Sequence, residues 1–382
     1  MSPTPVTFAT PNQPSAYTWE ATNEEVAARY GIPVEDIVRF DLNTAPLPPD
    51  LAQRVMAAGQ FHVSLSEYPP ADYRLLVEAA AARYGVGTDE LVVGAGADEI
   101  LDVIAKTFLA KGSRAVIPVP TYAMYRVLTE QRAANAVLVP RLGAAEGYAL
   151  DIPRMREAAR DAALLWLCSP NNPTALPEPD GAIETLLGLI EADAMTDGRA
   201  VPIVVVDEAY AEFVGRSLAG LRFAHPNLIT IRTASKAYAM AGLRVGFAVA
   251  RPELVARMNP IRPPGSVSTV SVTVVTEALK DDTLAASNVA RVIGERERLS
   301  TALADAGWSV GPSVTNFLLV DLGSVDRAAA AAEALLQRGL VPRTFPDTHP
   351  LADHLRLTVR SPEQNDRLVA AARDFEAGAR AS

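Results

Sequence analysis

Short runs of consecutive apolar residues, many of them β-branched, alternate with helix-like segments along the middle of this chain. The chain is 382 residues long and its hydrophobic content is 49%, enough to bury a large core. Buried runs separated by helices are typical of a parallel sheet that is covered on both faces. The pattern predicts an α/β fold whose large domain holds a mostly parallel sheet, with strands at Leu91–Gly94, Ala115–Val119, Leu164–Ser169, Ile203–Val206, Leu228–Ile231 and Val245–Ala250.

A proline-rich segment at 259–265 interrupts this alternation and is the strongest candidate for a domain boundary. Beyond it lie a long helical stretch at 270–304, apolar runs at 315–320 and 355–359, and a terminal helix. These elements predict a smaller α+β domain. We therefore expect an N-terminal arm and part of the small domain at 1–45, a large domain at 46–262, and a small C-terminal domain at 263–382.

Charge and composition exclude several classes of protein. The net charge of −10, from 35 basic and 45 acidic residues, argues against nucleic acid or an anionic membrane as the main partner. The single cysteine, Cys168, cannot form an intramolecular disulfide and fits a reducing compartment. We find no secretory signal and no apolar run long enough to span a bilayer, and the four histidines are scattered. We expect a cytoplasmic protein without a metal site.

Polar residues follow the ends of the predicted strands, where open α/β sheets bind their ligands. Turn chemistry alone can explain any single one of them, since turns favour Asn, Asp and Ser. The combination includes one lysine, Lys236, and a carboxylate, Asp207, that directly follows three valines. A buried carboxylate requires a cationic partner, either a protein arginine or a protonated ring nitrogen of a cofactor.

The glycine turn at 94–99 precedes a predicted helix. It does not match GxGxxG, because Glu99 occupies the position of the third glycine, and the chain contains no GxxxxGK[ST]. A glycine turn that leads into a helix N-terminus still offers backbone N–H groups to a phosphate.

Taken together, the motifs resemble those of fold-type-I aminotransferases, which use pyridoxal 5′-phosphate, and within them the histidinol-phosphate aminotransferases. The resemblance extends from about Tyr17 to Arg360. Its motifs are Glu67-Tyr-Pro, Gly94-Ala-Gly-Ala-Asp-Glu, Pro120-Thr-Tyr-Ala-Met-Tyr, Ser169-Pro-Asn-Asn-Pro-Thr, Val206-Asp-Glu-Ala-Tyr, Thr233-Ala-Ser-Lys-Ala-Tyr, Gly242-Leu-Arg-Val-Gly and Leu355-Arg-Leu-Thr-Val.

The resemblance implies a role for each residue around the cofactor ring. Lys236 would form an imine (an aldimine) with the cofactor and then move the proton of the substrate α-carbon, tasks that require a neutral amine. Asp207 would pair with the ring N–H⁺ and keep the ring an electron sink. Tyr210 and Asn172 would hydrogen-bond the ring hydroxyl, and Tyr122 would stack on the ring face.

The resemblance also places the cofactor phosphate at the start of the helix that follows the glycine turn. Backbone N–H groups of Ala97 and Asp98 would bind it. Thr233, Ser235 and Arg244 would add hydroxyl and guanidinium donors.

Further residues match positions that bind substrate or join subunits. Arg356 would hold the substrate carboxylate, or, with Arg343, a substrate phosphate. Asn43 keeps the first residue of a family motif near the substrate. Tyr68 resembles a tyrosine that reaches the cofactor phosphate of the neighbouring subunit, which implies a homodimer with shared active sites. Tyr17 belongs to an arm that we expect to reach a neighbouring subunit.

Three departures from the family pattern lie on the substrate side. The usual Asn-Glu-Asn-Pro is Asn43-Thr-Ala-Pro here, so Ala45 replaces the second Asn. The usual Asn-Pro-Thr-Gly ends in Ala175, and the usual Thr-Val-Gly ends in Arg360. None of these departures falls on a residue expected to bind the cofactor.

The resemblance implies transamination between L-histidinol phosphate and 2-oxoglutarate, a step of histidine biosynthesis. Two other activities use the same cofactor: decarboxylation of O-phosphothreonine in cobalamin synthesis, and transamination of aromatic amino acids. A fourth interpretation is a ligand-sensing regulator that keeps the fold, but such proteins carry an additional basic DNA-binding domain for which the N-terminal arm leaves no room.

Overall fold

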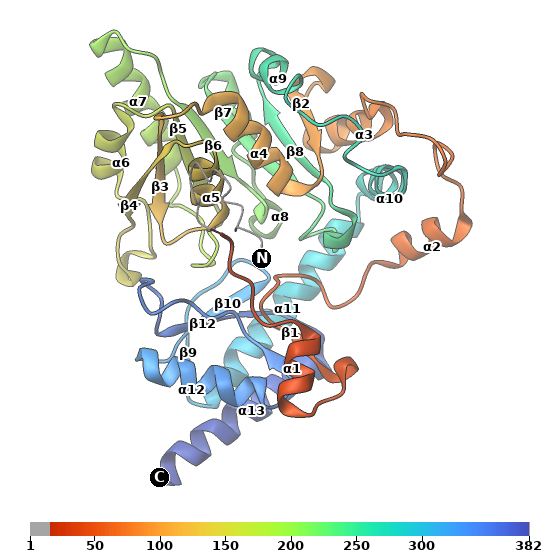
Figure 1. Ribbon diagram of the computed structural model, residues 1–382, viewed down its shortest axis with the longest axis vertical. Coiled ribbons are helices and arrows are strands. Elements are labelled where there is room, and N and C mark those ends of the chain that lie inside the picture. The colour runs from red at the N-terminus through yellow and green to blue at the C-terminus, as the bar shows by residue number, and fades with distance from the viewer. Residues whose placement is uncertain (1–15, 382) are drawn as a thin grey trace, which may run out of the picture.

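A computed structural model of the chain describes residues 16–381. It contains a large α/β part and a smaller α+β part, connected by the long helix α11 (Leu284–Asp305) (Figure 1). The N-terminal arm was expected within residues 1–45, and residues 1–15 lie outside the described residues. No helix in the described range is both long and apolar enough to cross a membrane.

The large part is built on a seven-stranded sheet. Every neighbouring pair is parallel except those that involve β8, which runs antiparallel to both β2 and β7. The prediction of a mostly parallel sheet is confirmed, whereas the run at Val245–Ala250 does not continue the parallel set. The strand order is β2 (Leu91–Gly94), β8 (Gly246–Ala250), β7 (Leu228–Thr233), β6 (Ile203–Asp207), β5 (Leu164–Cys168), β3 (Arg114–Val119) and β4 (Asn135–Pro140).

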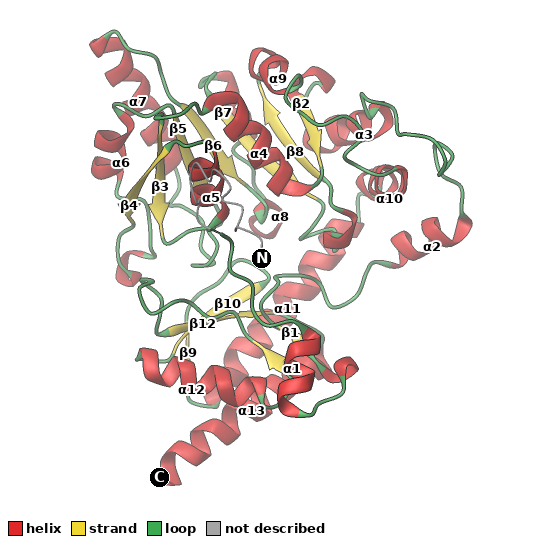
Figure 2. Ribbon diagram, in the orientation of Figure 1, coloured by secondary structure: helices red, strands yellow, loops and turns green. Residues whose placement is uncertain are grey.

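Both faces of this sheet are covered by helices (Figure 2). Successive strand residues point to opposite faces, so Val205 packs in one core cluster while Val204 and Val206 pack in another. One face carries α4 (Gly96–Phe108), α5 (Met124–Gln131) and α9 (Pro252–Met258). The opposite face carries α3 (Arg74–Tyr84), α6 (Ile152–Ala159), α7 (Ala182–Asp197) and α10 (Thr269–Lys280).

The helical stretch expected at 270–304 is two helices. Asp281 ends α10, and its carboxylate accepts hydrogen bonds from the backbone N–H groups of Thr283 and Leu284, where α11 begins. The two helices also pack differently. Although α10 follows residue 262, it packs against α3 and α2 (Asp50–Ala58) on the side of the large sheet, whereas α11 leads away into the small part (Figure 1).

The small part consists of an antiparallel sheet, a two-stranded parallel pair and their covering helices. The sheet has the order β12 (His354–Thr358), β10 (Phe317–Asp321), β9 (Ser309–Val310). The pair joins β1 (Val38–Arg39), from near the N-terminus, to β11 (Leu340–Val341). The N-terminal segment therefore belongs to the small part. The helices here are α1 (Asn23–Tyr30), α12 (Val325–Leu336) and α13 (Pro362–Ala381).

Candidate active site

The largest set of expected site residues lines one cavity of about 540 Å³ between the two parts of the molecule. The short helix α8 (Ala211–Val214) starts at its floor, directly after Tyr210. All of the expected residues except Tyr68 line the cavity, namely Tyr17, Asn43, Ala97, Asp98, Tyr122, Asn172, Asp207, Tyr210, Thr233, Ser235, Lys236, Arg244, Arg343 and Arg356. Tyr68 lies elsewhere and is 90% exposed.

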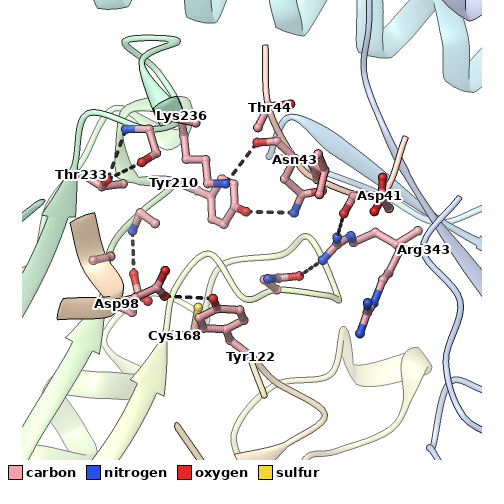
Figure 3. A pocket seen from close by; sticks show the side chains of 18 of the residues that line it. Asp41, Asn43, Thr44, Asp98, Tyr122, Cys168, Tyr210, Thr233, Lys236 and Arg343 are labelled. Atoms are coloured by element: carbon pink, nitrogen blue, oxygen red, sulfur yellow. Dashed lines mark hydrogen bonds between the residues drawn. The ribbon is translucent and has the colours of Figure 1, made fainter. Parts of the chain in front are cut away.

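Lys236 lies in the turn that follows β7, and its Nζ donates a hydrogen bond to the carbonyl oxygen of Asn43 at 3.1 Å. Figure 3 shows the Lys236 and Tyr210 side chains extending toward Asn43. Burial, with a contribution from the nearby Arg356 guanidinium, lowers the pKa of Lys236 to about 8. A substantial fraction of this amine is therefore neutral near physiological pH, and a neutral amine is the nucleophilic form.

Asp207 ends β6 at the bottom of the cavity and is 5% exposed. Its carboxylate accepts hydrogen bonds from the Tyr125 hydroxyl at 2.9 Å and from the backbone N–H of Ala209 at 3.0 Å. Burial raises the pKa of Asp207 to about 6. Within residues 16–381 no lysine or arginine forms an ion pair with Asp207. A protein arginine is thus excluded as its partner there, and the carboxylate fits a protonated ring nitrogen.

The other end of the cavity offers a set of donors suited to a phosphate. Helix α4 begins at Gly96, and the first N–H groups of a helix have no partner within it. Thr233 Oγ1 lies 2.9 Å from Ser235 Oγ, beside this helix start. Arg244 reaches the same corner and forms an ion pair of 3.2 Å with Asp98.

Close backbone packing brings these donors together. A Cβ on Gly246 of β8 would lie 2.7 Å from the Ala97 nitrogen and 2.5 Å from the carbonyl carbon of Gly96, so only glycine fits there. Gly96 itself has a φ of +81°, in the region that favours glycine. The two glycines allow strand β8 to contact the start of α4 directly, which is how the antiparallel strand contributes to the site.

Hydrogen bonds also connect the aromatic and amide residues of the cavity. The Tyr210 hydroxyl accepts a hydrogen bond from Asn43 Nδ2 at 3.0 Å, and burial raises its pKa. The Tyr122 hydroxyl donates to Asp98 Oδ1 at 3.0 Å (Figure 3). Asn172 Oδ1 accepts from Arg356 Nη1 at 2.6 Å. Acid, amine, hydroxyl and amide groups thus converge on one cavity.

Two arginines lie on the small-part side of the cavity. Arg356, on β12, is buried; its Nη2 donates to the Asp41 carbonyl, and its Nε has no hydrogen-bond partner among the described residues. Burial lowers the pKa of Arg356, which disfavours its charged form in the absence of an anion. Arg343 Nη1 donates to the Thr18 carbonyl at 2.7 Å.

Tyr17, which we expected to belong to an arm that reaches a neighbouring subunit, contacts the cavity of its own chain. The Tyr17 ring lies under the Arg343 guanidinium at 5.4 Å and meets the Tyr122 and Trp19 rings edge to face at 6.2 and 4.8 Å. Glu20 Oε1 fixes this segment by accepting a hydrogen bond from the backbone N–H of Thr344 at 2.8 Å. These contacts hold residues 17–20 against the cavity of their own chain.

Several site residues were not singled out from the sequence. The Tyr125 hydroxyl donates a hydrogen bond to Asp207. Asn316 Nδ2 donates to the Asn43 carbonyl at 3.0 Å, and the Asn43 backbone N–H donates to Thr358 Oγ1 at 2.9 Å. Tyr125 lies in the Pro-Thr-Tyr motif, three residues after Tyr122, so helical spacing could have indicated it. Asn316 and Thr358 are far from Asn43 in sequence, and no local signal marks them.

One group outside the cavity has the composition of a metal site. Asp321, Asp353 and His354 come close together in the small part. His354 Nδ1 lies 2.6 Å from an Asp353 carboxylate oxygen, so a hydrogen bond accounts for their proximity.

Comparison with known proteins agrees with the fold. The model of the family "Aminotransferase class I and II" matches residues 37–371. The histidinol-phosphate aminotransferase of Roseiflexus castenholzii is 37% identical over 356 residues, 91% of each chain.

Two solved structures share the fold. The histidinol-phosphate aminotransferase of Sinorhizobium meliloti, in complex with pyridoxal-5′-phosphate, superposes with a TM-score of 0.82 at 23% identity and covers 95% of this chain and 96% of that one. The L-threonine-O-3-phosphate decarboxylase of Porphyromonas gingivalis has a TM-score of 0.74 at 22% identity and covers 89% of this chain and 100% of that one. With the family match over most of its length, this chain belongs to the aminotransferase class I and II family and is an aminotransferase dependent on pyridoxal 5′-phosphate.

Proposed function

We propose that this enzyme transfers an amino group from L-histidinol phosphate to 2-oxoglutarate, a step of histidine biosynthesis in the cytoplasm. The observation that carries the proposal is the 37% identity to a histidinol-phosphate aminotransferase over 91% of both chains. The likeness to the phosphothreonine decarboxylase concerns the fold alone and does not favour that reaction.

The substrate side of the cavity fits this donor. Arg356 and Arg343 supply two cations for the phosphate of the amino donor or for a carboxylate of the acceptor. Tyr17, Trp19 and Tyr122 supply aromatic edges and faces at the mouth of the cavity, where an imidazole ring can pack.

The cofactor would be held by the residues that converge on the cavity. When bound, pyridoxal 5′-phosphate supplies an electron sink that stabilises negative charge on the substrate α-carbon. We propose that Lys236 Nζ holds the cofactor covalently and, once free, takes the α-proton as a general base. Asp207 would hold a proton on the ring nitrogen through its buried carboxylate. Tyr210 and Asn172 would donate hydrogen bonds to the ring hydroxyl.

The phosphate of the cofactor would lie at the α4 start. Backbone N–H groups of Ala97 and Asp98 would bind it, together with Thr233, Ser235 and Arg244. The positive end of the helix and the guanidinium both favour an anion there.

We propose a homodimer whose subunits share their active sites. Tyr68 supports this proposal, because it lies in a segment after α2 that extends away from the body of the chain, and it is 90% exposed. Leu65 and Leu47, from the same region, are 65% and 68% exposed, which is costly unless a partner covers them.

A single-turnover screen of amino donors tests the substrate. The cofactor-loaded enzyme is mixed separately with histidinol phosphate, glutamate, phenylalanine and phosphothreonine, and the absorbance of the bound cofactor is followed. We expect histidinol phosphate and glutamate to react. Release of carbon dioxide from phosphothreonine would show that the activity is decarboxylation instead. Reaction with phenylalanine but not with histidinol phosphate would show that it is aromatic transamination.

A further inference from the structure

The loop at residues 40–44 forms the wall of the cavity between the two parts of the enzyme. Figure 3 shows Asp41, Asn43 and Thr44 of this loop beside Lys236 and Tyr210. The Asn43 carbonyl accepts from Lys236 Nζ, and Asn43 Nδ2 donates to Tyr210. The position of this loop therefore affects both of the groups that would contact the cofactor.

Side chains of β12 and the residues after it hold this loop in place. The Thr358 hydroxyl lies 2.7 Å from the Phe40 carbonyl and accepts the Asn43 backbone N–H. Arg356 donates to the Asp41 carbonyl. Arg356 thus holds the loop and, in the proposed function, also binds the anionic group of the substrate.

Arg360, two residues after β12, also holds the loop. Its Nη1 donates to the Thr44 carbonyl at 2.9 Å and lies 3.3 Å from Thr44 Oγ1. Its Nε donates to Gln364 Oε1 at 3.2 Å, which fixes the side chain from the other side. Arg360 is not one of the residues that line the cavity, whereas Thr44 is.

Both partners of this contact depart from the family pattern. In the pattern that the resemblance implies, a glycine stands where this chain has Arg360, and a glutamate where it has Thr44. A glycine has no side chain that could make the contact. The two departures, 316 residues apart in sequence, meet in one hydrogen-bonded pair.

We propose that Arg360 is a positioning residue for substrate binding: it anchors the 40–44 loop through Thr44 and so keeps the Arg356 guanidinium in place to bind the anionic group. The inference rests on the proposed function in taking Arg356 as the anion-binding residue. It predicts that losing the Arg360 side chain weakens anion binding more than it slows the chemical step.

The test compares R360A and R360K with the wild type in the cofactor-loaded enzyme. Asn365 holds the Arg360 backbone, because its Oδ1 accepts a hydrogen bond from the Arg360 N–H and its Nδ2 donates one to the Arg360 carbonyl, both at 3.1 Å, so the variants keep their main-chain anchor. The matched control is R367A, because Arg367 is likewise an arginine that donates to backbone carbonyls, those of Asp36 and Arg338, but lies away from the cavity.

Two measurements are made on each variant. Hydrogen exchange of peptides that cover residues 40–47 reports the anchoring of the loop. The dissociation constant of glutarate, an unreactive dicarboxylate of the length of 2-oxoglutarate, reports anion binding through the absorbance of the bound cofactor. In R360A we expect faster exchange and at least about fivefold weaker glutarate binding, as for a lost charge-assisted hydrogen bond. For any donor that reacts, KM rises and kcat stays within about twofold.

R360K should recover most of the glutarate affinity, since an ammonium can reach the Thr44 carbonyl, and R367A should match the wild type. Unchanged exchange, or faster exchange with unchanged glutarate affinity in R360A, would overturn the inference. If histidinol phosphate does not react in the donor screen while glutarate affinity still depends on Arg360, the proposed substrate is wrong. The role of Arg360 in anion binding would still hold.

Discussion

Lys236 and Asp207 are both placed where burial opposes their charged forms. The amine has a pKa lowered to about 8, and the carboxylate a pKa raised to about 6. Neither is ion-paired with the other, and an anionic phosphate and a cationic ring nitrogen would restore favourable partners to the site. Without cofactor, burial disfavours the charged forms of both Lys236 and Asp207. Cofactor binding would relieve this cost, which would contribute to its affinity.

The pKa of Lys236 predicts a pH dependence. In cofactor-free enzyme, the rate at which added pyridoxal 5′-phosphate attaches to Lys236 should rise with pH and level off above about pH 8, because the neutral amine reacts. The Arg356 guanidinium contributes to the lowered pKa, so R356Q should move the midpoint to higher pH. Stopped-flow absorbance measures the rate. A midpoint near that of an ordinary lysine, about 10.4, would contradict the burial argument.

Asp207 predicts opposite effects on stability and on cofactor binding. A carboxylate whose folded pKa is raised destabilises the fold above that pKa, and the cost disappears as pH falls through about 6. D207N should therefore stabilise the cofactor-free enzyme at pH 8 by roughly 1 kcal/mol, and by less at pH 5.

The same substitution should weaken cofactor binding and lower kcat, since the amide cannot hold a proton on the ring nitrogen by charge. Thermal unfolding at the two pH values and cofactor titration measure the two effects. A D207N enzyme that is less stable than the wild type at pH 8 would show that its hydrogen bonds to Tyr125 and Ala209 outweigh the buried charge.

At the scale of elements, the site depends on direct contact between β8 and the start of α4. G246A would place a Cβ within 2.7 Å of the Ala97 nitrogen, against backbone that cannot move aside. We expect a loss of about 2 kcal/mol in stability and at least about tenfold weaker cofactor binding, because the phosphate donors shift.

The control is G294A in α11, where an added Cβ meets nothing within 4 Å. It should be neutral or slightly stabilising, since alanine is the better helix former. Denaturant unfolding and cofactor titration check both variants. Wild-type cofactor affinity in G246A would mean that the phosphate does not depend on this contact.

The elements show where sequence reasoning succeeded and why it failed elsewhere. Runs such as Ile203–Asp207 are apolar on both faces, which identifies a central strand but not its direction. The direction of β8 follows from the connection 234–245, which carries only a short turn of 3₁₀ helix at Ala241–Leu243. A parallel neighbour requires a longer crossover, usually a helix. Strand β4 was missed because most of its residues are partly or fully exposed at the sheet edge.

The site was predictable to the extent that its residues end strands within recognisable motifs. Asp207, Tyr210 and Lys236 line the cavity because parallel strands bring their carboxyl ends together. Residues that act through a neighbour, such as Asn316 behind Asn43, carry no such signal. The Thr44–Arg360 contact joins segments from the two ends of the chain, and only the folded molecule shows it.

For the whole molecule, the proposed homodimer gives Tyr68 a role that a single chain cannot. If Tyr68 donates a hydrogen bond to the cofactor phosphate of the partner, Y68F should weaken cofactor binding about tenfold, as for a hydrogen bond to a charged group. The molecular mass in solution should stay that of a dimer.

Light scattering and the rate of cofactor dissociation measure the two properties. Y30F serves as a control, because Tyr30 donates its hydroxyl to Glu333 in the small part, away from the cavity. A monomeric wild-type enzyme that retains its cofactor would contradict the shared site.

The single cysteine of the chain has a practical consequence. Cys168 lies at the end of β5, buried below the cavity, and burial raises its pKa to about 12. At pH 7 to 8 its thiol stays protonated and reacts poorly with maleimides or other thiol reagents. A cysteine introduced on the surface, for example M195C at a side chain that is 85% exposed, can therefore carry a fluorophore without a competing label, so that energy transfer between differently labelled copies reports subunit exchange directly.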